Sequence, residues 1–80
     1  MRLPEDGIVR IGCERRRAGR MTTIHGLKSA ELLDTAAALK RRCGTGGTVK
    51  DGIVELQGDR REAVLAYFTA LGRRAKRMGG

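Results

Sequence analysis

Residues 43–61, CGTGGTVKDGIVELQGDRR, place several glycines and a β-patterned run between two helix-patterned segments. Asp51-Gly52 is a dipeptide that two-residue hairpin turns prefer, because both central positions adopt positive φ. The runs 48–50 and 53–57 on either side therefore predict a β-hairpin. Two helices joined so tightly by a hairpin favour a small sheet with the helices packed against it.

The segment before this hairpin has helical periodicity. Apolar residues recur every three or four positions along one face: Leu32, Ala36, Leu39 and Cys43. This spacing predicts a helix over residues 30–43. We expect Ser29 to be its N-cap and Gly44 to be its left-handed C-cap.

A second helix is predicted after the hairpin. Asp59 and Glu62 have the spacing of a reciprocal capping box, and Gly72 is the expected stop. Between them runs an apolar stripe: Val64, Tyr67, Phe68 and Leu71. The basic tail that follows is compatible with a short edge strand, because charge on an edge discourages unwanted pairing.

The N-terminal part predicts another hairpin. Residues 7–15 alternate with Val9, Ile11 and Cys13 on one face, as in a half-buried strand. Residues 21–27, MTTIHGL, have strand composition, but the pattern leaves open which of their faces points inward.

The predicted element order is β-β-α-β-β-α-(β), which gives an α+β fold. Its simplest packing is a two-layer α/β sandwich, with two helices on one face of a small mixed sheet. We expect residues 1–80 to form a single domain, with a core of about 6–78.

Charge is the strongest global signal. Seventeen Lys and Arg against nine Asp and Glu give a net charge of +8, which favours a polyanionic partner. Aromatic residues are only 2%, so recognition of a nucleic acid would depend on phosphates and shape rather than base stacking. The chain has neither a long apolar run nor an aromatic-anchored amphipathic helix nor a signal peptide, so we expect no membrane binding and a cytoplasmic location.

Catalysis and metal binding are not predicted. A chain of 80 residues has a thin core, and His25 is accompanied by no nucleophile or acid pair of a known motif. The stretch GTGGTVK follows a helix and opens a strand, the reverse of a phosphate-binding P-loop. Cys13, Cys43 and His25 lack zinc-ligand spacing, so we expect no cofactor, no metal and no enzyme activity.

Arginines surround the tip of the first hairpin: Arg15, Arg16, Arg17 and Arg20. They are candidate phosphate ligands, and a solvated loop is an equally good interpretation. Lys40 and Arg41 lie in the last turn of the first helix, where cations stabilise the helix dipole, so a structural role takes precedence there. Arg60 and Arg61 lie in a first helical turn, where the dipole disfavours cations; a local cost without a visible local gain favours a ligand role.

The motifs RRRAGRMTTIHGL and KRRCGTGGTVKDGIVELQGDRR resemble the translation initiation factor 1 family of eukaryotes and archaea, with its short bacterial relatives. The resemblance covers roughly residues 6–80 and implies a two-layer α/β fold. It further implies a monomer that binds the small ribosomal subunit near the peptidyl site, with initiator tRNA and other initiation factors as further partners. The chain resembles the stand-alone bacterial or archaeal form.

The resemblance also implies roles for individual residues. Arg16, Arg17 and Arg20 match the family's basic loop, and Lys40 and Arg41 match its helix face, both of which approach ribosomal RNA. The resemblance further places Lys50 near the turn that lies toward the tRNA. It places Arg60 and Arg61 at the family's basic pair. Two alternatives stay open: general RNA binding without ribosomal specificity, and inhibition or modulation of initiation under stress.

Overall fold

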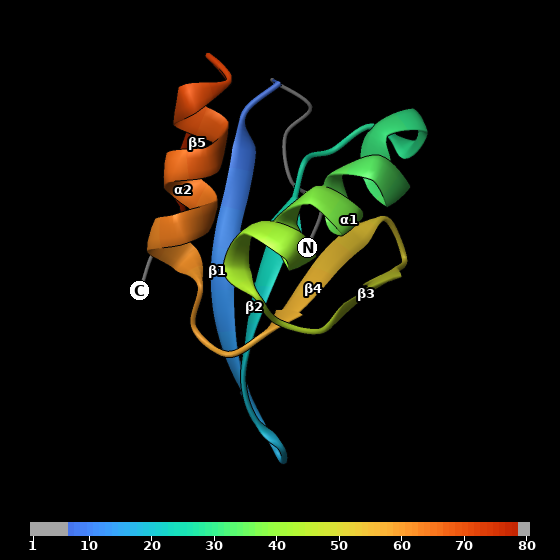
Figure 1. Cartoon of the computed structure of the whole chain (residues 1–80), viewed down its shortest axis with the longest axis vertical. Coiled ribbons are helices and arrows are strands. Elements are labelled where there is room, and N and C mark those ends of the chain that lie inside the picture. The colour runs from blue at the N-terminus through green and yellow to red at the C-terminus, as the bar shows by residue number, and fades with distance from the viewer. Residues whose placement is uncertain (1–6, 79–80) are drawn as a thin grey trace.

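The computed structural model describes residues 7–78, which form a five-stranded mixed sheet with two helices on one face (Figure 1). The strands are ordered β3-β4-β2-β1-β5, and only β5 runs parallel to its neighbour. This arrangement confirms the predicted α+β fold. The elements are β1 (Val9–Arg16), β2 (Gly19–His25), η1 (Ser29–Glu31), α1 (Leu32–Cys43), β3 (Gly47–Lys50), β4 (Ile53–Gln57), α2 (Arg61–Ala70) and β5 (Ala75–Arg77).

The core lies between the helices and the sheet face that they cover. Its buried residues are Val9, Ile11, Ile24, Leu32, Ala36, Leu39, Val54, Leu56, Val64 and Phe68. Val9 and Ile11 point inward, as the alternation predicts. In β2, Ile24 points toward the helices, so Thr22 lies on that face too and Met21, Thr23 and His25 lie on the uncovered face.

The start of the first helix differs from the prediction. A 3₁₀ turn, η1, precedes α1, so the α-helix begins at Leu32 rather than at residue 30. Ser29 is not the N-cap, because it lies inside the 3₁₀ turn; Lys28 occupies the cap position, and its N–H donates to the Glu31 carboxylate at 2.8 Å. Gly44 ends α1 at φ 60°, as predicted.

The predicted capping box of α2 is wrong. The helix begins at Arg61 with Arg60 as its N-cap, so Glu62 lies too early in the first turn to reach back to residue 59. Glu62 instead accepts a hydrogen bond from the Arg77 guanidinium of β5 at 3.2 Å. Asp59 binds the Arg61 side chain, as described below.

The other end of α2 has the expected glycine stop. Gly72 has φ 75°, and the N–H of Arg73 donates to the Phe68 carbonyl at 2.9 Å, which closes a Schellman motif. Leu71 was expected on the buried stripe, but it is 60% exposed because the helix ends at Ala70 and the chain turns away there.

The β1–β2 hairpin extends beyond the rest of the sheet (Figure 1). β1 pairs with β5 only over Val9–Ile11, and β2 pairs with β4 only over Thr22–Ile24. Residues 14–21 therefore form a two-stranded ribbon, which we call the ribbon. An isolated two-stranded ribbon is only marginally stable in water, so its contacts with the rest of the domain decide how firmly it is held.

Candidate nucleic-acid interface

Two arginines face each other across the ribbon. Arg15 and Arg20 are directly opposite partners in the β1–β2 ladder, so their exposed side chains lie on the same side. Arg17 occupies the turn at the tip. Within residues 7–78, none of the three forms an ion pair. Like charges directly opposite each other are destabilising, so the ribbon carries a local electrostatic cost that an anionic ligand would relieve.

Arg16 points to the opposite side. It lies within β1 rather than in the loop, and its guanidinium donates to the carboxylates of Glu14 and Glu55 at 2.7 Å each. The hydrogen bond from Arg16 is the main cause that lowers the pKa of Glu55 below its usual value. Arg16 is thus already neutralised by acidic partners, unlike the other three tip arginines.

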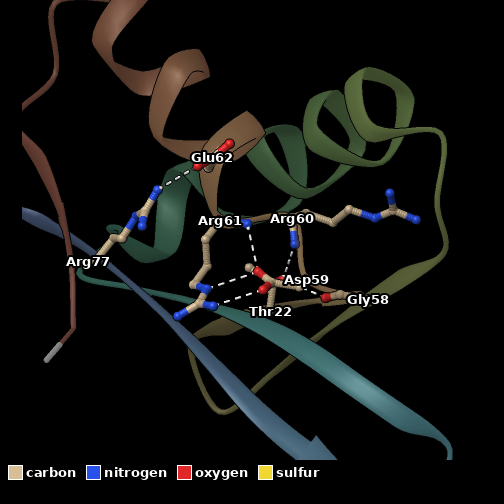
Figure 2. A network of polar contacts seen from close by, with 7 residues as sticks. All are labelled: Thr22, Gly58, Asp59, Arg60, Arg61, Glu62 and Arg77. Atoms are coloured by element: carbon tan, nitrogen blue, oxygen red, sulfur yellow. Dashed lines mark hydrogen bonds and ion pairs between the residues drawn. The ribbon is translucent and has the colours of Figure 1, made fainter. Parts of the chain in front are cut away.

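Thr22 fixes the turn that leads into α2 (Figure 2). Its fully buried hydroxyl donates to the Gly58 carbonyl at 2.6 Å and accepts the Arg60 N–H at 2.7 Å. The Gly58 N–H in turn donates to the Arg20 carbonyl at 2.8 Å. The turn is therefore held against β2 by main-chain and side-chain hydrogen bonds.

The side chains of Arg60 and Arg61 point in different directions. Figure 2 shows the Arg60 side chain directed away from Asp59, whereas Arg61 folds back onto it. The Arg61 guanidinium donates two hydrogen bonds to the Asp59 carboxylate, at 2.9 and 2.8 Å, which lowers the pKa of that carboxylate to about 2. Sequence reasoning missed this local gain, which offsets the cost of a cation in the first turn of α2.

The C-terminal turn of α1 is connected to the same region. The Gln57 carbonyl accepts hydrogen bonds from the Thr45 hydroxyl at 3.1 Å and from the Arg60 Nε at 3.2 Å. The Thr45 N–H donates to the Lys40 carbonyl at 3.2 Å. Figure 1 shows this end of α1 on the same side of the molecule as the ribbon.

Basic residues from five segments thus converge on one end of the domain, which we call the basic end. It consists of Arg15, Arg17, Arg20, Lys40, Arg41 and Arg60. Lys40 is partly exposed and the other five are exposed, and among residues 7–78 no carboxylate lies within ion-pair distance of any of them. Such a surface is suited to the phosphates of a nucleic acid.

Three predicted site residues lie outside the basic end. Lys50 is at the β3–β4 turn, separated from the ribbon by the length of β4, and it lies on the uncovered face of the sheet. Arg16 and Arg61 are held by acidic partners. Their side chains have structural roles that the sequence pattern did not reveal.

The uncovered face contains a shallow polar hollow of about 520 Å³. Gly12 forms part of its floor, and a Cβ there would come within 2.9 Å of Thr23 Oγ1. His25 Nε2 lies 3.0 Å from the same hydroxyl, and burial lowers the pKa of this histidine. In the described part of the chain, no three potential ligands gather to hold a metal ion. None of the helices described between residues 7 and 78 has the length and apolar character to cross a membrane.

Fold and surface together define a small basic α+β domain with a protruding hairpin. Comparison with known proteins gives its family: the model of translation initiation factor SUI1 matches residues 5–74. The chain is 43% identical to the YciH protein of Escherichia coli over 81 aligned positions, which cover 94% of this chain and 73% of that protein. It is 45% identical to the protein translation factor SUI1 homolog of Aeropyrum pernix, over 85% of this chain and 70% of that protein.

These matches cover most of the chain and most of each relative. The chain therefore belongs to the translation initiation factor SUI1 family, and its general role is that of a translation-initiation-factor-like protein.

Proposed function

We propose that this chain binds the small ribosomal subunit near the peptidyl site and influences the selection of the start codon and initiator tRNA. The observation that carries the proposal is the basic end, where exposed or partly exposed cations from five segments converge on one surface. Family membership supports a role in initiation.

The mechanism would be occupancy rather than catalysis. Arg15, Arg17 and Arg20 would contact ribosomal RNA phosphates from the ribbon, and Lys40 and Arg60 would contact them from the body of the domain. Positioning by phosphates carries no sequence information, which suits a large pre-folded RNA. A bound monomer near the peptidyl site would disfavour incorrectly paired initiator complexes by steric exclusion. This role places the protein in the cytoplasm, with initiator tRNA and other initiation factors as neighbours.

The test is co-sedimentation with isolated small subunits, compared with large subunits and duplex RNA, over a salt series. We expect selective binding to the small subunit. Arg17→Gln should weaken this binding and reduce its salt slope by about one. Lys50→Gln is the matched control, because it removes the same charge from an exposed residue outside the basic end. Equal losses in both variants would show that net charge, not this surface, governs binding.

A second function is general RNA binding, which the net charge of +8 supports without any ribosomal specificity. Equal affinity for small subunits, large subunits and duplex RNA would favour it. A role as an inhibitor of initiation uses the same binding site, and a translation assay with limiting initiator tRNA separates it from a role in start-codon selection.

A further inference from the structure

We propose that Arg16 is a positioning residue rather than an RNA contact, and that its ion pair with Glu55 holds the basic ribbon in its binding orientation. This inference rests on the proposed function, because it concerns how the basic end is presented to RNA. It assigns a role in binding to Glu55, an acidic residue that would otherwise oppose an anionic partner.

The ribbon has few contacts with the rest of the domain. Neither β5 nor β4 pairs with residues 14–20, and the ladders end at Ile11 on one side and Thr22 on the other. The turn before α2 supports the base of the ribbon, where Met21 forms a β-bridge with Gly58 and the Gly58 N–H donates to the Arg20 carbonyl. The Arg16–Glu55 pair is a second tether, and it lies on the uncovered face of the sheet.

This tether crosses a considerable length of strand. Thr23 pairs with Glu55 on one side and with Gly12 on the other, so these three residues share one row of the sheet. Arg16 lies four residues beyond Gly12, which is roughly 13 Å along an extended strand. The 2.7 Å contact therefore needs two extended side chains that point toward each other across the face.

Burial makes the acidic partner an effective anchor. The Glu55 side chain is only 11% exposed, whereas the Glu14 side chain is 56% exposed. Glu14 lies two residues from Arg16 on the same strand, so its ion pair cannot fix the ribbon relative to the sheet. Among the ion pairs of residues 7–78, the Glu55 pair alone joins the ribbon to a distant strand, 39 residues away in the sequence.

The two interpretations of Arg16 predict opposite effects for removal of Glu55. If Arg16 binds phosphate, Glu55→Met frees it, raises the net charge from +8 to +9 and tightens RNA binding. If Arg16 positions the ribbon, Glu55→Met loosens the ribbon and weakens RNA binding despite the added positive charge. Glu14→Met makes the same charge change without cutting the tether, so it measures the effect of charge alone.

The experiment begins with the free proteins, by amide hydrogen exchange of the ladder between residues 14 and 21. We expect exchange to be at least about tenfold faster in Glu55→Met and in Arg16→Met than in Glu14→Met, because an untethered ribbon opens locally. Thermal unfolding of each variant confirms that the rest of the domain is folded. Equal exchange in Glu55→Met and Glu14→Met would overturn the tether.

Binding to small ribosomal subunits then tests the consequence. We expect Glu55→Met to bind at least about fivefold more weakly than Glu14→Met, and Arg16→Met to lose affinity without a change in salt slope. A slope reduced by about one in Arg16→Met would identify a phosphate contact and contradict the proposal. If the wild-type protein shows no preference for small subunits, the proposed function fails, whereas the exchange data still decide whether the tether exists.

Discussion

Replacement of Thr22 by Val should destabilise the protein strongly for so small a change. The Thr22 hydroxyl is fully buried, and its loss leaves the Gly58 carbonyl and the Arg60 N–H without their partners. Each unsatisfied group costs about 1–3 kcal/mol. Because the Arg60 end of the turn is exposed, water will offset part of this cost, and we expect a loss of about 2–4 kcal/mol.

Chemical and thermal unfolding measure this loss. For a domain of this size, about 2 kcal/mol lowers the melting temperature by at least about 8 °C. Thr45→Val is the matched control, because that hydroxyl makes a single hydrogen bond to the Gln57 carbonyl and is partly exposed. We expect it to cost less than about 1 kcal/mol. Equal losses in the two variants would refute the reasoning that Thr22 holds the turn into α2.

Three further predictions concern acid stability, close backbone approach and the core. Arg61 lowers the pKa of Asp59 from 3.8 to about 2, so the Asp59 carboxylate stabilises the fold above about pH 4 and loses this contribution as the pH falls toward 2. Unfolding titrations should therefore show that the stability difference between wild type and Asp59→Asn shrinks over that pH range. In denaturant unfolding, Gly47→Ala should lower the free energy of unfolding by about 1–3 kcal/mol, because the new Cβ would lie 2.5 Å from the Glu55 carbonyl oxygen. Gly46→Ala is the control and should cost far less, because the nearest atoms to its Cβ lie at 3.6 Å. Phe68→Ala should cost about 3–5 kcal/mol in the same assay, and a loss below about 1 kcal/mol would contradict its place in the core.

Local signals explain why much of the fold could be predicted. The Asp51-Gly52 turn carries its own conformational preference, and both of its residues have positive φ. The alternation of Val9 and Ile11 places them in the core without knowledge of the rest of the chain. Gly44 likewise ends α1 because of a property of that residue alone.

Non-local contacts explain what the sequence did not reveal. Whether Asp59 caps a helix or pairs with Arg61 depends on where α2 begins, and the Thr22 hydroxyl, 38 residues from Arg60, fixes that turn. The arginines at the tip of the first hairpin were predicted as one group because the sequence does not show which distant residues each of them meets. Only the strand register shows that Arg16 meets Glu55 on the face opposite to Arg15.

Directed hydroxyl-radical cleavage from the ribbon tip tests the central claim most directly. An iron chelate would be attached at Ala18→Cys in a protein whose natural cysteines, Cys13 and Cys43, are replaced by Ser and Ala. We expect the bound protein to cleave small-subunit RNA in a compact region next to the peptidyl site, and competition by the unlabelled protein should remove the cleavage. Cleavage scattered over both subunits, or confined to a region far from the peptidyl site, would contradict the proposed function.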